Sequence, residues 1–239
     1  MNYEPSLGSS RTRHDFNVNI ENYVKAIWTL SQQKERADEP VKNSEIASYL
    51  RITRPSVTDM LRKLESKKLL KSEGGRSGVK LTPGGKRLAV EVLRKHRLIE
   101  MFLHKTLDFK GMELHEEAEL LEHAMSSRLM ERIDAYLGNP AQDLSGMAIP
   151  DAGDLHHRDF EAGARTLMHL ESGQSGEIVS LADYDLPSLN RCYEQGLKVG
   201  LKFKVVDKVD EDFVQIQTKN GILLTLGSRQ ASLVKVKRS

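Results

Sequence analysis

The apolar residues of this chain change their spacing near Ser175, and that change constrains the fold class most strongly. Before this point they recur at helical spacing, as in Tyr23, Val24 and Ile27. After it, short segments alternate between apolar and polar residues and are separated by turn residues, which predicts strands. These segments are EIVSL, LKFKVVDKV, FVQIQT, GILLTL and SLVKVK. We therefore expect a mainly α protein with a small C-terminal β-barrel.

Charge is segregated along the chain, although the total of 36 Lys and Arg against 34 Asp and Glu is nearly neutral. Residues 42–110 contain 17 basic and 7 acidic residues, whereas residues 111–194 contain 5 basic and 17 acidic residues. Residues 195–239 are again basic, with 9 against 4. The near-neutral total excludes a strongly cationic nucleic-acid coat protein. The basic block favours contact with DNA phosphate, and the acidic block favours a bound cation.

The single cysteine, Cys192, excludes an internal disulfide framework and a zinc site built from several thiolates. The polar N-terminus has no apolar segment of the kind found in signal peptides, and the apolar runs are too short to span a bilayer. We therefore expect a cytoplasmic protein with no membrane partner.

The segment NSEIASYLRITRPSVTDMLRKLESKKLL predicts a helix-turn-helix, and the hairpin pattern after it predicts a wing. Ser44 is expected to cap a short helix over 45–50, and Thr53 to cap a recognition helix to about residue 67. The residues expected to face DNA from that helix and the wing are Thr53, Arg54, Pro55, Ser56, Thr58, Asp59, Arg62, Lys63, Arg76 and Lys80. The alternative is a winged helix used for protein contacts, which the basic charge of this block disfavours.

The rest of the chain is expected to contain two long helices and a loop before the strands begin. One helix starts at Pro83 and runs through Leu107, and a second covers 112–137. A loop over 138–153 and a short helix around 154–171 follow. The expected regions are a flexible arm over 1–18, a winged helix-turn-helix domain over 19–83, a helical domain over 84–153, and a linker helix with a small β domain over 154–239.

Histidine and carboxylate residues recur on single faces of the two long helices. His96 and Glu100 are four residues apart, and His115, Glu119, Glu122 and His123 occupy one face of the next helix. A core-facing stripe would be apolar at these positions, because burying uncompensated carboxylates and imidazoles is costly. This combination suits a divalent metal of the first transition row rather than a thiolate-dependent metal.

With these residues in place, the chain resembles the diphtheria-toxin-repressor family of metal-dependent transcriptional regulators. The resemblance rests on the winged helix-turn-helix, on RKHRLIE over 94–100 and on HEEAELLEH over 115–123. The tail, with GEIVSL and GLKVGLKFKVV, resembles the SH3-like domain that longer members share with the ferrous-transport protein FeoA. The resemblance implies that the helical domain over 84–153 is a metal-binding and dimerisation domain. It also implies a homodimer that binds palindromic double-stranded operator DNA when metal is bound, with repression of metal-uptake genes as the expected outcome.

The resemblance also implies two ligand sets. His96, Glu100 and His115 would form one site, completed by Asp185 from the SH3-like domain. Glu119, Glu122 and His123 would form the other, completed by Asn22 of the first helix. Iron-sensing members have Cys where this chain has Glu119, whereas manganese-sensing members have a carboxylate. The expected cofactor is therefore Mn²⁺, with Fe²⁺ as the alternative.

Two other functions fit parts of the pattern. One is a helical di-metal hydrolase or oxidase, since Glu119, Glu122 and His123 include the Glu-x-x-His spacing of carboxylate-bridged metal enzymes. Only two ligand-bearing helices are found, however, so no enzyme activity is expected. The other is a metal-independent winged-helix regulator. The SH3-like domain is expected to stabilise the protein or donate a ligand, rather than to bind Pro-rich peptides.

Overall fold

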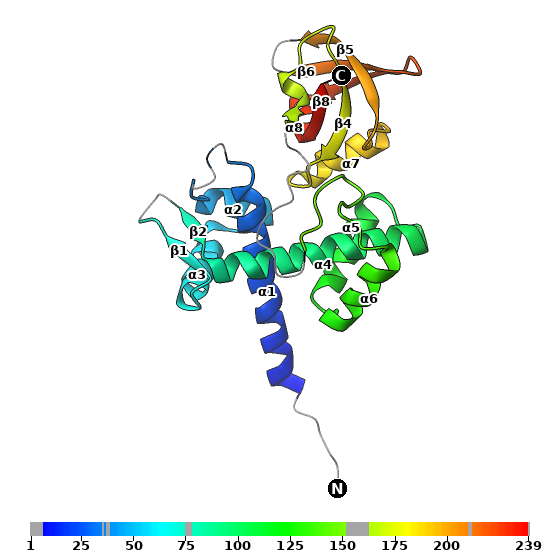
Figure 1. Ribbon diagram of the computed structural model, residues 1–239. Coiled ribbons are helices and arrows are strands. Elements are labelled where there is room, and N and C mark those ends of the chain that lie inside the picture. Colours follow the sequence, from blue (N-terminus) through cyan, green and yellow to red (C-terminus); the bar gives the residue numbers. More distant parts are fainter. Residues whose placement is uncertain are drawn as a thin grey trace. The chain divides into compact units, whose positions relative to one another are not determined.

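The computed structural model describes residues 7–34, 36, 39–74, 78–151, 163–209 and 212–238. Its helices (Figure 1) are α1 (Leu7–Ser31), α2 (Asn43–Leu50), α3 (Arg54–Ser66), α4 (Pro83–Leu107), α5 (Gly111–Glu122), α6 (Ser127–Leu137), α7 (Leu186–Glu194), α8 (Ser228–Leu233) and the 3-10 helix η1 (Leu167–His169). Its strands are β1 (Leu70–Ser72), β2 (Val79–Leu81), β3 (Arg165–Thr166), β4 (Ser175–Leu181), β5 (Lys202–Val209), β6 (Phe213–Thr218), β7 (Leu223–Gly227) and β8 (Val234–Arg238).

The chain divides into two compact units. The first contains Met1–Lys95, Glu122–Ala124 and Pro150–Leu155, and the second contains His96–Leu121, Met125–Ile149 and His156–Ser239. Helices α4 and α5 contribute to both units, because the boundaries fall within them. Within the described residues, no helix combines the length and apolar character needed to cross a membrane.

In the first unit, α1 and α3 both pack against α2, and the hairpin β1–β2 lies beside α3 (Figure 1). This arrangement confirms the predicted helix-turn-helix followed by a hairpin. The buried apolar side chains that hold it together are Ile20, Tyr23, Val24, Ile27, Trp28, Val41, Ile46, Ala47, Val57, Leu61, Leu64, Leu70, Val79, Ala89, Val90 and Leu93.

The first helix is longer than the sequence pattern predicts. Its apolar spacing begins near Val18, but α1 begins at Leu7, so the expected flexible arm over 1–18 is wrong from Leu7 onward. The stretch 11–17 contains neither Gly nor Pro, and such a stretch can continue a helix without an apolar face. Residues 1–6 lie outside the described part of the chain.

The turn between α2 and α3 is defined at both of its ends. Arg51 ends α2 in the left-handed conformation, with φ of 54°. Thr53 caps α3 as predicted, since its side-chain oxygen accepts a hydrogen bond from the backbone N–H of Ser56. The predicted cap of α2 was wrong: Lys42 is the N-cap, and its backbone N–H donates to Glu45 at 2.7 Å. Ser44 lies inside the first turn.

The wing depends on a close approach between two backbones. Its strands pair from Leu70 with Leu81 to Ser72 with Val79. Val41 also bridges Val79, next to Gly78, whose φ is +105°. A Cβ on Gly78 would lie 2.5 Å from the carbonyl oxygen of Val41. Only glycine therefore fits at this position.

In the second unit, the part of α4 from His96 onward packs with α5 and α6. The buried side chains of this core are Leu98, Ile99, Met101, Leu103, Leu114, Ala118, Met130, Ile133 and Ile149. The prediction of one helix over 112–137 was wrong, because α5 ends at Glu122 and α6 begins at Ser127. Ser126 is the N-cap of α6, and its hydroxyl accepts the N–H of Leu129 at 3.3 Å. A capping side chain satisfies the backbone donors of a new helix and so favours a break here.

The C-terminal part of the second unit is a six-stranded antiparallel sheet with the order β3-β8-β4-β5-β6-β7. The five strands expected from the sequence correspond to β4 through β8, which confirms a small β domain after a helical body. Its core is made of buried side chains from the sheet, from α7, α8 and η1, and from the segments that connect them: Leu167, Leu170, Ile178, Leu181, Ala182, Leu189, Cys192, Leu197, Phe203, Val205, Val214, Ile216, Leu226, Ala231, Leu233, Val234 and Val236.

Three local features of this domain differ from the prediction. The sequence reading missed α7 and α8. For α7 a signal is present, since Asp185 precedes a Pro in the first helical turn and caps the helix. Within the expected helix around 154–171, residues 154–162 lie outside the described part. The remainder forms β3 and η1 rather than an α-helix.

Candidate metal centres and nucleic-acid interface

The first candidate metal centre, called here the first cluster, consists of His96 and Glu100 on α4 and His115 on α5. His96 Nε2 lies 3.0 Å from Glu100 Oε1 and 3.0 Å from His115 Nδ1. His115 Nδ1 lies 3.1 Å from the same Glu100 oxygen. Two helices thus bring three predicted ligands together, with their donor atoms almost equally spaced.

This spacing fits a bound divalent cation. Ligands that bind a small octahedral cation at about 2.1 Å lie roughly 3 Å from their nearest neighbours. The donor set of two imidazoles and one carboxylate is also chemically suitable, since first-row transition metals accept nitrogen and oxygen donors together. The first cluster therefore meets both the geometric and the chemical requirement of such a site.

The charges in the first cluster also favour a cation. Burial alone would raise the pKa of Glu100, but the charges and hydrogen bonds of His96 and His115 hold that pKa well below its usual range. Burial alone would lower the pKa of His115, but hydrogen bonds to Glu100 and Glu119 raise it above its ordinary 6.5. The carboxylate is therefore ionised, and protons compete with metal for His115.

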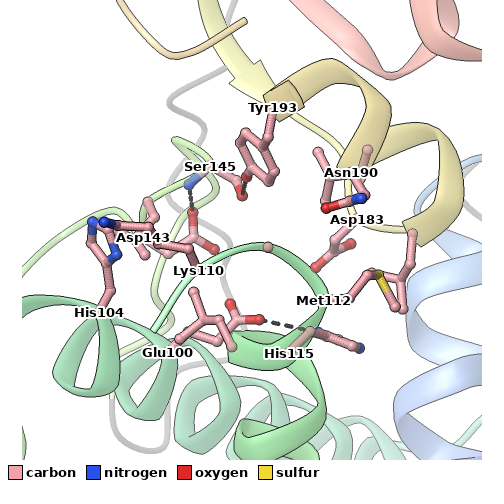
Figure 2. Close-up of a pocket in the computed structure, with 15 residues that line it drawn as sticks. Glu100, His104, Lys110, Met112, His115, Asp143, Ser145, Asp183, Asn190 and Tyr193 are labelled. Carbon is pink, nitrogen blue, oxygen red and sulfur yellow. Dashed lines mark hydrogen bonds and ion pairs between the residues drawn. The ribbon is translucent and has the colours of Figure 1, made fainter. Parts of the chain in front are cut away.

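Glu100 and His115 line a cavity of about 400 Å³ together with side chains from the sheet domain. Figure 2 shows Asp183 and Tyr193 on the sheet-domain side of this cavity, and Asp143 in the loop after α6. A carboxylate of the sheet domain thus reaches the cavity of the first cluster, as the resemblance implies. The residue that does so is Asp183.

In the structure, Asp185, which the resemblance assigns to the first cluster, is the N-cap of α7. Its carboxylate caps α7, accepting the backbone N–H of Ser188 at 3.2 Å and the Ser188 hydroxyl at 2.7 Å. Asp185 is not among the residues that line the described cavity, whereas Asp183 is. The carboxylate chosen from the sequence lies two residues after the one that lines the cavity, because the sequence prediction did not include the helix that begins after Asp185.

A buried arginine contacts both aspartates of this cavity. Arg97 Nε lies 3.1 Å from Asp143 Oδ2, and Arg97 Nη2 lies 3.7 Å from Asp183 Oδ2. The Arg97 guanidinium also donates to the carbonyl oxygen of Ala148. Burial raises the pKa of Asp143 to about 7, although Arg97 opposes that shift. Arg97 therefore links α4, the loop after α6 and the sheet domain within the second unit.

Hydrogen bonds within the loop that carries Asp143, and from that loop to the sheet domain, fix its position. Asp143 Oδ1 accepts the backbone N–H groups of Ser145 and Met147 at 2.8 and 2.9 Å. Ser145 forms a 2.6 Å hydrogen bond with the Tyr193 hydroxyl, and its carbonyl accepts the N–H of Leu181 at 2.8 Å. The sequence predicts only a connecting loop over 138–153. No local motif reveals its role, because its partners lie on distant segments.

The second candidate metal centre, called here the second cluster, lies in the first unit, where α1 meets the end of α5. His123 Nε2 lies 2.8 Å from Asn22 Oδ1 and 3.3 Å from Glu122 Oε1. An imidazole, an amide oxygen and a carboxylate therefore converge, as the resemblance implies for these three residues. Lys25 of α1 also enters this cluster, with Nζ 2.6 Å from Glu122 Oε1.

Glu21 is a member of the second cluster that the sequence reading missed. Its Oε2 lies 2.6 Å from His123 Nδ1. Histidine ligands of metals commonly donate their second ring N–H to a carboxylate, which fixes the tautomer. Glu21 therefore leaves Nε2 of His123 as the nitrogen available to a cation. Its position directly before Asn22 on the same helix is the sequence signal that could have identified it.

Glu119 is the fourth ligand that the resemblance implies for the second cluster, and it lies beside the first cluster. Its Oε1 lies 3.5 Å from His115 Nε2. This contact joins the two predicted ligand sets along α5, since His115 and Glu119 are one helical turn apart.

The predicted recognition helix α3 has one buried face and one exposed face. Its core face is Val57, Leu61 and Leu64. Of the residues expected to meet DNA, Thr58 is half-buried and the following are exposed: Thr53, Arg54, Pro55, Ser56, Asp59, Arg62 and Lys63. On the wing, Lys80 is half-buried, with Nζ 3.6 Å from Glu73. Arg76 lies outside the described residues. Exposure of the α3 residues permits the predicted contact with base edges and phosphates.

Comparison with family models accounts for most of the chain. Residues 15–77 match the iron dependent repressor N-terminal DNA binding domain. Residues 82–151 match the iron dependent repressor metal binding and dimerisation domain. Residues 165–238 match the FeoA domain. The order of the three models corresponds to the order of domains expected from the sequence.

Similar proteins and solved structures agree with these matches. The diphtheria toxin repressor of Corynebacterium efficiens is 26% identical over 226 residues, covering 91% of this chain and 94% of that protein. The iron-dependent repressor IdeR of Mycobacterium leprae is 32% identical over 162 residues, covering 67% and 68%. A manganese-dependent transcriptional repressor in complex with manganese is 30% identical, with a TM-score of 0.77, and the match covers 92% of this chain and all of that one.

Proposed function

The chain belongs to the diphtheria toxin repressor family of metal-dependent transcriptional repressors, and we propose that Mn²⁺ is the cation that activates it. In this proposal a homodimer binds palindromic operator DNA when the cation is bound. Fe²⁺ is the alternative cation. The cation acts by shifting a conformational equilibrium when the donor atoms of the clusters bind it.

The donor atoms of the two clusters are the observation that carries the proposal. They are imidazole nitrogens, carboxylate oxygens and the amide oxygen of Asn22. The only thiol of the chain, Cys192, is buried in the sheet-domain core, where the Gln230 side chain lies 4.0 Å from its sulfur. A set of nitrogen and oxygen donors without thiolate suits Mn²⁺ better than softer cations. The similarity to a manganese-dependent transcriptional repressor in complex with manganese also supports Mn²⁺ as the cation.

The first unit contains a direct path from the second cluster to the recognition helix. A cation held by Asn22, Glu122 and His123 supplies positive charge that joins α1 to the end of α5. Tyr23, next to Asn22, is buried in the core and donates from its hydroxyl to the Ser56 carbonyl at 3.4 Å. A shift of α1 is therefore transmitted to the start of α3, where DNA-facing residues lie.

This path explains how metal binding and DNA binding would be coupled. A ligand shifts an equilibrium only by its different affinities for the two conformations. If the DNA-competent position of α1 binds the cation more tightly, operator DNA strengthens metal binding by the same factor. Two recognition helices then read two half-sites, whose spacing is fixed by the dimer.

Exposed apolar side chains on α5 and α6 support the proposed homodimer. Leu120 is 70% exposed, Leu129 45% and Tyr136 68%. Contiguous exposed apolar side chains commonly mark a protein interface. Sedimentation of the protein and of Leu120→Glu tests this part, with dissociation of the variant as the expected result.

A titration of operator binding tests the proposed cation. The protein is stripped with EDTA, and DNA binding is measured while Mn²⁺ or Fe²⁺ is added. Binding that appears at lower free Mn²⁺ than free Fe²⁺ supports the proposal. His123→Ala should lose the response to the cation. His169→Ala is the control, because His169 forms a hydrogen bond with Thr166 in the sheet domain, and this variant should keep the response. Operator binding that persists undiminished in EDTA would overturn the proposal.

A further inference from the structure

The second cluster contains a cation of its own. Lys25 Nζ lies 2.6 Å from Glu122 Oε1, and the side chains are 10% and 0% exposed. Glu122 is therefore a fully buried carboxylate whose close partner is an ammonium group. Such a carboxylate is strongly destabilising unless a positive charge compensates it.

The lysine and the proposed metal site use the same oxygen atom. Glu122 Oε1 accepts the Lys25 ammonium and also lies 3.3 Å from Nε2 of His123. Glu21 orients His123 so that Nε2 faces this oxygen. A divalent cation bound to that nitrogen and oxygen would lie within a few ångströms of the ammonium group. Two positive charges at such a short distance repel each other strongly in a buried site.

The position of Lys25 on α1 follows from the helix itself. Glu21, Asn22 and Lys25 are spaced so that all three lie on the face toward the end of α5. Their neighbours Val24 and Ile27 are fully buried apolar residues of the core. An apolar side chain at position 25 would fit the helix equally well, but it would leave Glu122 without its ammonium partner.

We infer that Lys25 is an internal competitor for the metal at the second cluster. It neutralises Glu122 when no metal is bound and must move from Glu122 Oε1 when a divalent cation binds. Lys25 thus stabilises the metal-free protein and raises the free metal concentration at which the repressor responds. This inference rests on the proposed function, because it requires that the second cluster bind metal.

The inference predicts opposite effects of one substitution on two measurements. Lys25→Met keeps much of the side-chain length and removes the charge. The metal-free variant should unfold at a lower temperature than the wild type, because Glu122 loses its compensating charge. The same variant should bind Mn²⁺ roughly tenfold more tightly or better. The reason is that the repulsion between the Lys25 ammonium and a divalent cation bound close to it exceeds about 1.4 kcal/mol. A lysine with a purely structural role would lower stability without strengthening metal binding.

The experiment measures free Mn²⁺ by electron paramagnetic resonance during titration of the full-length protein, and unfolding temperature in EDTA. The binding step that disappears in His123→Ala is assigned to the second cluster. Lys34→Met is the matched control, because Lys34 pairs with Glu39 and Glu45 away from either cluster. That control should leave Mn²⁺ affinity unchanged. Lys25→Arg retains the charge and should keep affinity near that of the wild type.

A second variant covers the possibility that Lys25→Met does not fold in EDTA. Lys25→Met combined with Glu122→Gln removes both charges and should recover the metal-free unfolding temperature while losing the His123-dependent step. Lys25→Gln then replaces Lys25→Met in the affinity measurement. Unchanged or weaker Mn²⁺ binding in the folded variant overturns the inference alone. Absence of a His123-dependent step in the wild type overturns the metal assignment of the second cluster, and the inference with it.

Discussion

His123 Nδ1 lies 2.6 Å from Glu21 Oε2, so the second ring nitrogen of this histidine faces Asn22 and Glu122. The carboxylate thus holds the imidazole in the orientation and tautomer that a metal ligand requires. Neighbours of this kind typically contribute a factor of about 10 to 100 to metal affinity.

Glu21→Gln is therefore expected to weaken Mn²⁺ binding at the second cluster by about 10- to 100-fold, since an amide fixes the tautomer less firmly than a carboxylate. Calorimetric titration of the stripped protein measures the effect. Glu39→Gln, which changes a carboxylate paired with Lys34, provides the control. Equal affinities for Glu21→Gln and the wild type would show that Glu21 does not orient the ligand.

Metal binding at the first cluster is expected to weaken as the pH falls. The pKa of His115 is raised above 6.5 by its bonds to Glu100 and Glu119, and a proton on His115 must leave before it can bind metal. Without metal, this raised pKa contributes stability below 6.5, which is lost as the pH rises through the folded-state pKa. The stabilisation by Mn²⁺ should therefore increase between about pH 6 and about pH 8.

Unfolding temperatures with and without Mn²⁺ across that range measure this dependence. Calorimetry in two buffers that differ in protonation enthalpy should also detect protons released on binding. Glu119→Gln removes one bond that raises the pKa of His115, so the dependence should move to lower pH. A Mn²⁺ effect independent of pH would contradict the assignment of His115 as a ligand.

Asp183 and Asp185 are expected to have separate roles that matched substitutions can distinguish. Asp183→Ala removes the sheet-domain carboxylate from the cavity of the first cluster and should lower metal affinity there roughly tenfold or more. Asp185→Ala removes the cap of α7 and should lower the free energy of unfolding by about 1 kcal/mol, with metal affinity unchanged. Titration and urea unfolding of both variants provide the test. Loss of metal affinity in Asp185→Ala alone would restore the original assignment.

Asp183 and Asp185 also show which residues of the first cluster the sequence alone could not identify. His96 and Glu100 could be paired from the sequence because both lie on one helix, where spacing determines the face. Asp183 could not be chosen over Asp185 in this way, since the choice depends on where α7 begins. Arg97 was missed for a related reason: its partners come from a loop and a sheet domain far along the chain.

The DNA-binding domain was more accessible to prediction than the clusters. The cap at Thr53 follows from the local sequence, and the structure has it as expected. Lys25 was not predicted as a cluster member, because a lysine on a helix is normally solvated. Its burial results from the approach of the end of α5, which the sequence of α1 does not encode.

Arg97→Met is expected to destabilise the second unit in a pH-dependent manner. Removing the guanidinium leaves Asp143 buried without its partner, which costs roughly 3–5 kcal/mol when the carboxylate is ionised. Burial already raises the pKa of Asp143 to about 7, so this residue contributes stability at low pH that is lost as the pH rises through that value. The variant removes the charge that opposes this shift, so its deficit should be larger at about pH 8 than at about pH 5.

Urea unfolding of Arg97→Met at both pH values provides the measurement. Combining it with Asp143→Asn removes the unpaired charge and should recover most of the stability at high pH. A deficit that is the same at both pH values would indicate that the hydrogen bond from Arg97 to Ala148, rather than the charge of Asp143, dominates.

Arg62→Gln is expected to weaken operator binding without changing sequence preference. Arg62 lies on the exposed face of α3, and its guanidinium lies 3.7 Å from Asp59, too long for a strong ion pair at the surface. If it contacts a phosphate, its loss should reduce the slope of log affinity against log salt by about 0.9. Lys105→Gln, an exposed lysine near the end of α4, is the control and should leave that slope unchanged. Anisotropy titrations at several salt concentrations, with Mn²⁺ in excess, measure both slopes. An unaltered slope for Arg62→Gln would remove this residue from the phosphate contacts, whereas a changed preference at one base pair would assign it to base recognition.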